Sequence, residues 1–415
     1  MTEPCLKSIS PDGVTGMIFA LEGMKNTVVL LNGPMGCRFY HSTTSRFLSV
    51  RPLLYLPTED GAERVRVDYN YLNDWFFRQE RVPCTYLDGE DFVYGSGDKV
   101  QAALRFIREN IDFDLLAVVN SPGASLIGDN MLELARRELG NTRAVMLESP
   151  GLSTSFEEGY AEALRALLTQ VGRGLWQTPP TKKRGVNLLG LSIWHRYCEG
   201  DIRELKRLLG LCGIEVNSVL CAGSDLDELR RLPEAELNIV LYPELGLDAA
   251  RLLEEDCGTP WYLCPTAPVG FEATERFIKD VCRLLGRSPA PVLAESERAR
   301  GLAWYKIDQI YQSSGRPRGS RFFVKTFPAM EKAYRAFLTD YLGMAASPPE
   351  EAELVFSDAN VIAELKLKNR VFCGIEVSLP GMGYTDLIPK THLGLEGALF
   401  LIEQVLNGLM TRLSD

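Results

Sequence analysis

The sequence predicts an α/β protein made of three β-α units. Short apolar runs without alternation recur along the chain, as expected for strands buried in parallel sheets. Segments with helical spacing separate these runs, which gives β-α alternation throughout. At 415 residues the chain also exceeds what one hydrophobic core usually fills, so several domains are expected.

The first unit is expected to span residues 1–180. Its expected elements, in order, are a helix over 11–25, strand 27–31, helix 99–110, strand 114–120, a turn at 121–123, a helix starting near 126–130, strand 143–147 and helix 157–168.

Two proline-rich stretches, 178–184 and 287–292, read as linkers that set off a second unit (185–286) and a third (293–415). The second is expected to form its own small parallel sheet, with strands over 185–192, 215–220, 237–242 and 261–263 and helices over 201–211, 226–232 and 248–255. The third is expected to hold helices over 295–312, 329–342, 360–366 and 395–413, with strands over 321–326, 352–356 and 371–377.

The composition narrows the class of protein. Apolar content of 46% and charged content of 24% are ordinary for a globular protein, and a formal charge of −10 argues against nucleic-acid binding. No apolar stretch reaches the roughly 18 residues of a membrane span, and no amino-terminal export signal is found. We therefore expect a cytoplasmic protein.

Ten cysteines occur without any C-x-x-C pair, which fits neither a disulfide framework nor a structural zinc site. Cys37 follows strand 27–31 in a turn flanked by Gly33 and Gly36, where the backbone can approach closely. A thiol there suits an iron–sulfur cluster, although Cys37 can equally be a small buried hydrophobe. Cys5 and Cys84 also lie near expected element ends, and three thiolates need a fourth ligand or a partner subunit.

Several short motifs occur along the chain in a fixed order, and the first is Gly33-Pro34-Met35-Gly36-Cys37. They continue with the segments 91–95 (DFVYG), 126–130 (LIGDN), 148–151 (ESPG), 155–160 (SFEEGY) and 392–397 (HLGLEG). In this order the chain resembles the nitrogenase component 1 family. The resemblance implies three Rossmann-like domains, each a parallel sheet with flanking helices.

By that resemblance, Cys5 and Cys37 match the first two ligands of an iron–sulfur cluster that bridges two subunits. An ATP-hydrolysing iron protein supplies its electrons. Where the family has its third cysteine this chain has Ser121-Pro122-Gly123, which makes Cys84 the substitute candidate and Ser121 a weaker oxygen ligand. A 4Fe-4S cluster is therefore expected, with an eight-iron P-cluster-like group as the alternative.

The family's active-site metallocluster is not expected in this chain. Tyr242 occupies the position of its cysteine ligand, and residues 381–383 (GMG) occupy that of its histidine ligand. The resemblance then leaves an interdomain cleft for an organic substrate or a precursor cluster.

Two further groups of residues are candidates. His195 and Arg196 directly follow the strand 185–192, and we expect them to act as proton donor and as anchor for a substrate carboxylate, unless they form an ordinary surface turn. His41, four residues after Cys37, either donates to a cluster sulfide or is a plain interface residue.

Three functions follow from the resemblance. The favoured hypothesis is a subunit of a nitrogenase-like oxidoreductase that passes electrons from the iron protein, through the interface cluster, to a substrate in the cleft. The alternatives are a scaffold for metallocluster assembly and a β-like structural subunit. In each case the chain pairs with a second copy or with another component 1-like subunit.

Overall fold

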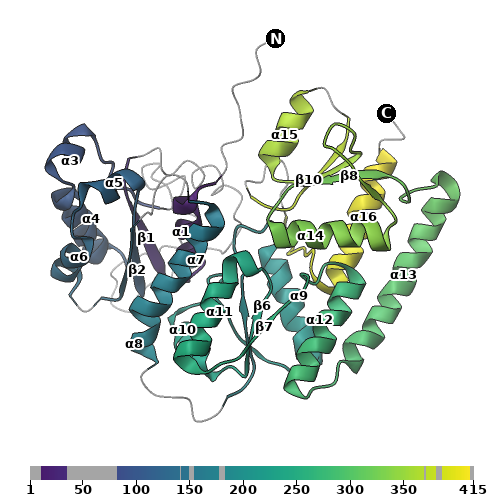
Figure 1. Ribbon diagram of the computed structural model, residues 1–415, viewed down its shortest axis with the longest axis horizontal. Helices are drawn as coiled ribbons and strands as arrows, with labels where there is room; N and C mark the ends of the chain where they lie inside the picture. Colours follow the sequence, from purple (N-terminus) through teal and green to yellow (C-terminus); the bar gives the residue numbers. More distant parts are fainter. Residues whose placement is uncertain are drawn as a thin grey trace, which may run out of the picture.

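The computed structural model describes residues 11–34, 82–140, 142–148, 154–176, 183–368, 371–379 and 386–411. Within these residues the strands form three sheets in which every strand pair is parallel, with helices packed around them (Figure 1). The predicted α/β class is therefore confirmed.

The first sheet has the order β1-β2-β3. Its strands are β1 (Thr27–Asn32), β2 (Leu115–Asn120) and β3 (Ala144–Leu147). The helices of this unit are α1 (Gly13–Glu22), α3 (Gly89–Tyr94), α4 (Gly97–Asn110), α5 (Pro122–Ile127), α6 (Met131–Leu139), α7 (Phe156–Leu167) and α8 (Arg173–Leu175), with a π-helical turn (Leu168–Gly172) between the last two. Strands β1 and β2 align so that both end together, with Asn32 opposite Asn120.

The expected turn at residues 121–123 is wrong. Ser121 is instead the N-cap of α5, where its hydroxyl accepts a hydrogen bond from the Ala124 N–H, and Pro122 takes the first helical position. Serine followed by proline is itself a helix-start signal, because the hydroxyl satisfies a free N–H and proline has no N–H to satisfy.

The second sheet has the order β5-β4-β6-β7. Its strands are β4 (Val186–Leu189), β5 (Val216–Val219), β6 (Leu237–Val240) and β7 (Trp261–Leu263). Its helices are α9 (Cys198–Leu211), α10 (Leu226–Arg231), α11 (Pro243–Cys257) and α12 (Gly270–Leu285), with a short 3₁₀ turn (Leu232–Glu234) after α10.

The third sheet has the order β11-β10-β8-β9. Its strands are β8 (Arg321–Val324), β9 (Ala345–Ala346), β10 (Leu354–Ser357) and β11 (Cys373–Glu376). Its helices are α13 (Ala290–Ser314), α14 (Pro328–Ala336), α15 (Ala359–Leu367) and α16 (Gly394–Thr411), and a π-helical turn (Phe337–Tyr341) follows α14. The expected linker at residues 287–292 is partly wrong, because α13 begins inside it and buries Val292.

Helices α1 and α7 cross at very close range, which two glycines permit. A Cβ on Gly16 would lie 2.0 Å from the Phe156 carbonyl oxygen, and one on Gly159 would lie 1.9 Å from the Gly13 carbonyl oxygen. This crossing packs α1 against α7, and α1 also contacts β1, the strand that follows it.

The three sheets share one large hydrophobic core. It includes side chains from α1, α7, β4, β6, β8 and β10. Helix α16, at the end of the third unit, packs against α9, α12 and α13 of the neighbouring elements. The domain boundaries proposed from the sequence stay predictions. In the part of the chain that the structure describes, no helix combines the length and apolar character needed to cross a membrane.

Candidate functional site

The carboxyl edge of the first sheet carries a buried thiol. Residues 83–85 run beside β1, where the Leu31 N–H donates to the Pro83 oxygen and the Thr85 N–H donates to the Leu31 oxygen. This places the Cys84 thiol to donate to the Gly33 carbonyl oxygen at 3.0 Å. The Tyr86 N–H points at the same sulfur from 3.4 Å.

Ser121 meets Gly33 from the neighbouring strand. A Cβ on Gly33 would lie 2.6 Å from the Ser121 hydroxyl oxygen, so only glycine allows this approach. The structure thus brings two predicted site residues, Cys84 and Ser121, against the residue that follows β1. The other four that were predicted for this edge, Cys5, Gly36, Cys37 and His41, lie outside the described residues and stay predictions.

A chain of hydrogen-bonded side chains, which the sequence analysis missed, crosses the same edge. The Asn32 amide donates to the Asn120 side-chain oxygen at 2.9 Å, and the Asn120 amide donates to Glu148 at 2.8 Å. The Thr85 hydroxyl donates to the Asn32 side-chain oxygen at 2.8 Å. The available signal was that two adjacent strands both end in asparagine, which in register places the two amides side by side.

This edge suits an iron–sulfur cluster as far as its described residues go. Thiolate is the ligand that such clusters use, a backbone N–H already points at the Cys84 sulfur, and Gly33 leaves the edge uncrowded. Among the described residues, however, no three histidine, cysteine or acidic side chains gather as a metal-binding group. Cys84 would therefore be one ligand of a set completed from elsewhere.

Exposed apolar side chains lie on α3 and α5 and at Tyr86, whose N–H contacts the Cys84 sulfur. Tyr94 and Leu126 are 86% and 88% exposed, and Val93, Phe92 and Tyr86 are exposed with them. The two helices pack against each other, and a Cβ on Gly123 would meet the Phe92 ring at 2.8 Å. We call these five exposed residues the α3–α5 patch. Large exposed apolar side chains on two helices that pack together are typical of a protein-binding site.

The carboxyl edge of the second sheet is filled by aromatic rings. Trp194 lies 4.7 Å from Phe19 of α1 and 4.9 Å from Phe156 of α7, measured between ring centroids. The His195 ring lies 4.6 Å from Tyr242, which follows β6, and 5.7 Å from Phe327, which follows β8. Rings thus pack beside Tyr242, at the position where the resemblance places the family's cysteine ligand.

His195 is buried in this ring cluster and is neutral at neutral pH, because burial lowers its pKa to about 3. The Ser192 N–H donates to its Nδ1 at 3.3 Å, so the hydrogen of the neutral ring lies on Nε2. That Nε2 is buried and has no hydrogen-bond partner among the described residues. A donor left without an acceptor in this way is uncommon in folded proteins.

Arg196 is buried as well, and two carboxylates already face it. Its guanidinium pairs with Asp386 at 2.6 Å and approaches Glu376 at 3.8 Å. It also lies over the Tyr197 ring at 5.5 Å. A substrate carboxylate at this position has to compete with Asp386 for the guanidinium.

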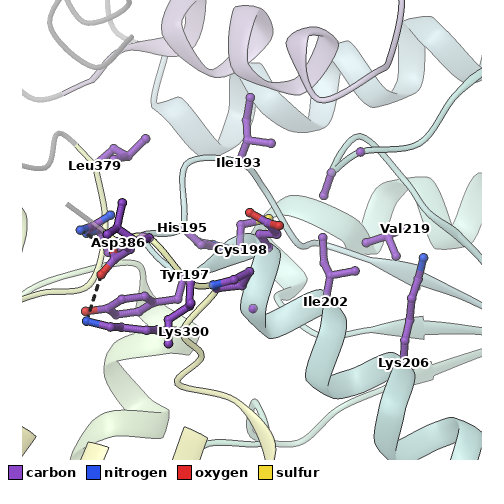
Figure 2. Close-up of a pocket in the computed structure, with 18 of the residues that line it drawn as sticks. Ile193, His195, Tyr197, Cys198, Ile202, Lys206, Val219, Leu379, Asp386 and Lys390 are labelled. Atoms are coloured by element: carbon purple, nitrogen blue, oxygen red, sulfur yellow. Dashed lines mark ion pairs between the residues drawn. The ribbon is translucent and has the colours of Figure 1, made fainter. Parts of the chain in front are cut away.

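A cavity of about 570 Å³ lies beside these residues, between the start of α9 and residues 386–390. Figure 2 shows Asp386, Tyr197 and Lys390 on one side and Ile202, Val219 and Lys206 on the other, with His195 and Cys198 between them. Among the described residues, its charged lining residues balance in sign, three basic and three acidic: Arg196, Lys206, Lys390, Glu199, Glu228 and Asp386. This balance and an apolar wall suit an organic molecule of low net charge.

Two buried acids of α9 bind the segment 391–395, which directly follows the cavity-lining residues 386–390. Asp201 Oδ1 accepts hydrogen bonds from the Thr391 hydroxyl and the His392 N–H, at 2.7 and 2.9 Å. Glu204 accepts from the Leu395 N–H at 3.0 Å, at the start of α16. The sequence analysis missed both acids. In a sequence, an acid on a buried helix face cannot be distinguished from one on a solvent-exposed face until the element packed against the helix is known.

His392 is also buried and links the segment that follows residues 386–390 to α14 and α16. Its Nδ1 lies 2.5 Å from the Tyr334 hydroxyl and its Nε2 lies 2.6 Å from the Gln404 side-chain oxygen. The Gln404 amide in turn donates to the Tyr197 hydroxyl at 3.3 Å. Burial lowers the pKa of His392 to about 4, so this ring is neutral too.

Three comparisons with known proteins agree with this architecture. The family model described as Nitrogenase component 1 type Oxidoreductase matches residues 13–347. The chain is 35% identical, over 264 residues, to the B-type subunit of the light-independent protochlorophyllide reductase of Synechococcus sp. (strain CC9311), covering 60% of this chain and 48% of that protein. It is 30% identical to the corresponding B-type subunit from Synechococcus sp. (strain RCC307), covering 77% of this chain and 62% of that protein.

The chain spans about half the length of the curated relatives that it matches first. Among solved structures, the one described as Nitrogenase Cp1 at pH 6.5 superposes with a TM-score of 0.71 at 16% identity, covering 100% of this chain and 95% of that chain. At that identity the match speaks for the fold alone.

Proposed function

The chain belongs to the nitrogenase component 1 type oxidoreductase family, and from this premise we propose that it is a subunit of a nitrogenase-like iron–sulfur reductase. In this proposal an ATP-hydrolysing iron protein supplies the electrons, and a substrate in the cavity between α9 and residues 386–390 receives them. The similarity to protochlorophyllide reductase subunits supports the reductase class, and the balanced charge of the cavity supports an organic substrate.

The observation that carries the proposal is the thiol of Cys84 at the carboxyl edge of the first sheet. It lies against the residue that follows β1, the strand that leads toward Cys37. Cys5, Cys37 and Cys84 would hold the cluster, with Gly36, His41 and Ser121 around it. A bound cluster would supply one-electron transfer at low potential.

The α3–α5 patch gives the iron protein a place to dock. It lies beside Cys84, since the Tyr86 N–H bonds to the Cys84 sulfur, so a partner seated there comes close to the thiol. Its apolar side chains would be covered in the complex, which accounts for their exposure in the single chain.

His195 and Arg196 have modest roles in this proposal. A neutral His195 offers a hydrogen bond from Nε2 rather than an imidazolium proton. Arg196, paired with Asp386, positions the segment 386–390 at the wall of the cavity that the substrate would enter.

A second candidate function, a β-like structural subunit that provides half of an interface cluster, is favoured by one observation. Aromatic rings close the space beside Tyr242, whereas the edge at Cys84 keeps a thiol and polar groups. The same closure leaves the scaffold hypothesis without a described cavity for a precursor cluster beside Tyr242.

The test is iron and acid-labile sulfide analysis with EPR on anaerobically purified full chain, before and after dithionite. We expect about four irons per pair of chains and a reducible signal in the wild type. Cys84→Ala should lose both, whereas Cys282→Ala, which removes a buried thiol from α12, should keep both.

Full iron content and an unchanged signal in Cys84→Ala contradict the proposed ligand. Eight or more irons per pair indicate the larger cluster instead. Addition of iron protein, ATP and a candidate substrate then separates the two functions, because a structural subunit on its own reduces nothing.

A further inference from the structure

Four hydrogen-bonded side chains lead from the core to the cavity: Tyr334, His392, Gln404 and Tyr197. The direction of these bonds is set at the buried end. Among the described residues the Tyr334 hydroxyl is buried and hydrogen-bonds only to Nδ1 of His392. A tyrosine hydroxyl has one hydrogen to donate, and leaving that hydrogen without an acceptor in the core costs about 1–3 kcal/mol. The Tyr334 hydroxyl therefore donates to Nδ1.

The directions of the next two bonds follow from the first. His392 is neutral, because burial lowers its pKa to about 4. Since Nδ1 accepts, the one hydrogen of the neutral ring lies on Nε2, and it is donated to the Gln404 side-chain oxygen at 2.6 Å. The amide nitrogen of Gln404 then faces Tyr197 and donates to its hydroxyl oxygen at 3.3 Å.

Tyr197 is left with a hydrogen to donate. Burial raises its pKa to about 12, so the hydroxyl keeps its hydrogen at neutral pH. Because the oxygen accepts from Gln404, this hydrogen points away from Gln404, and it is donated to no other group among the described residues. Tyr197 lines the cavity, and Figure 2 shows its ring beside Lys390 at the end where Asp386 lies.

The Tyr197 ring is held from three sides. Its centroid lies 4.4 Å from that of His392 and 5.6 Å from that of Phe400, and the Arg196 guanidinium lies over it at 5.5 Å. A donor that is already held in place loses little conformational freedom when it binds a ligand, so it contributes more of its hydrogen bond to affinity.

The charges around Tyr197 indicate which acceptor suits this donor. Asp386 pairs with Arg196 at 2.6 Å and with Lys390 at 3.1 Å, and Glu376 lies 3.8 Å from Arg196. A ligand carboxylate at this end of the cavity would face both acids and be repelled by them. The uncharged oxygen of a ketone or an amide accepts the same hydrogen bond without that repulsion.

We propose that Tyr197 donates a hydrogen bond to an uncharged carbonyl oxygen of the substrate. Tyr334, His392 and Gln404 are positioning residues, which keep the Tyr197 hydrogen turned away from the core. The cavity then disfavours a molecule that lacks the carbonyl oxygen, because the Tyr197 donor is left unpaired beside it. This inference rests on the proposed function in taking the cavity as the substrate site, and it is independent of the cluster.

The first test is the position of the ring hydrogen on His392, from long-range ¹H–¹⁵N spectra of the full-length chain with ¹⁵N-labelled histidine. The chain has three histidines, so His41→Gln and His195→Phe identify the signals of the third. We expect a hydrogen on Nε2 and none on Nδ1. A hydrogen on Nδ1 reverses the direction of the bonds and overturns the proposal.

The second test compares the binding of acetophenone and ethylbenzene by saturation-transfer NMR at pH 8. These probes have the same carbon skeleton and differ by one carbonyl oxygen. Tyr197→Phe should lower the ratio of acetophenone affinity to ethylbenzene affinity about fivefold. Gln404→Glu should lower the ratio as well, because its carboxylate accepts the Tyr197 hydrogen and turns it away from the cavity.

Tyr341→Phe is the control, since it removes a hydroxyl from the turn that follows α14 and should leave the ratio unchanged. Circular dichroism checks that each variant is folded. The same ratio in Tyr197→Phe as in the wild type, or no binding of either probe, overturns the proposal. An unchanged ratio in Gln404→Glu refutes the positioning role.

These outcomes are separate from those of the iron analysis. A chain that shows the expected ratios but binds no iron refutes the iron–sulfur reductase and leaves Tyr197 as a carbonyl donor. The expected iron content with an unchanged ratio refutes only the role of Tyr197.

Discussion

The carboxyl edges of the first and second sheets have the same parallel construction and opposite chemistry. At the first, β1 and β2 end in hydrogen-bonded asparagines, and a thiol, a hydroxyl and Gly33 follow. At the second, Trp194 and His195 follow β4 and Tyr242 follows β6; the His195 ring packs on Tyr242, and the Trp194 ring packs on Phe19 and Phe156.

The difference shows that the parallel topology determines where a site can lie. The residues that follow each strand determine what that site can bind. Parallel strands bring their carboxyl ends to one edge in both sheets. Small and polar residues follow the strands of the first sheet. At the second edge bulky rings belong to the core that joins the sheets, and the cavity lies beside them, lined by residues that follow β4 and β5.

The largest expected effect comes from opening the ring cluster. Trp194→Ala should lower the free energy of unfolding by about 3–5 kcal/mol, because the cavity left against Phe19 and Phe156 cannot collapse fully. Urea denaturation measures this loss. Trp304→Ala, at an exposed position on α13, is the control and should change stability by less than about 0.5 kcal/mol. Equal losses in the two variants would show that the rings do not join the sheets.

A smaller effect is expected on acidification. Unfolding restores the His195 pKa from about 3 to its ordinary 6.5, so the unfolded chain binds a proton that the folded chain excludes. The contribution of His195 to the free energy of unfolding is fully present above pH 6.5. It decreases as the pH falls toward 3, and about 2 kcal/mol of it is lost at pH 5. His195→Phe should flatten that fall in urea midpoints measured between pH 7 and 5.

Burial also lowers the pKa of His392. Because His392 remains in the variant, part of the fall in stability with pH should remain. An acid slope identical to that of the wild type would mean that the pKa of His195 is the same in the folded and unfolded chains, and that burial does not lower it.

Much of this contrast could be predicted from the sequence. Apolar runs indicated the strands because parallel strands are buried on both faces, and the spans 27–31 and 261–263 agree closely with β1 and β7. The placement of His195 and Arg196 just beyond β4 was also predicted, since carboxyl ends of parallel strands face a common edge.

What fills that edge could not be predicted. The expected strand 185–192 continues too far, because the chain turns at Gly190, whose φ is +91° and whose Cβ would lie 2.5 Å from the Tyr242 oxygen. The rings of Tyr242 and Phe327 come from other strands, and their meeting with His195 depends on how two sheets pack. Asp386, the partner of Arg196, is equally remote in sequence.

The contribution of the polar edge of the first sheet to stability can also be measured by urea denaturation. Asn120→Leu keeps the volume but removes the acceptor of the Asn32 amide and the donor to Glu148, and should cost about 1–2 kcal/mol of unfolding free energy. Asn110→Leu, at an exposed asparagine, is the matched control for the same urea measurement. If Asn120→Leu is as stable as the wild type, the asparagine chain is dispensable and this edge is held by the backbone alone.

The smallest expected effect concerns Asp201, which ties the cavity wall to α9. Burial raises its pKa to about 6 from 3.8, so the folded chain holds a proton that the unfolded chain releases, and its contribution to stability falls as the pH rises from about 4 to 6. This is the opposite sign to His195. Its bonds to Thr391, His392 and Leu393 all end on Oδ1, which asparagine also provides. Asp201→Asn should therefore equal or exceed the wild type at pH 7, by on the order of 1 kcal/mol, and lose this fall. A clearly less stable variant at pH 7 would mean that the negative charge, rather than the acceptor, holds the wall.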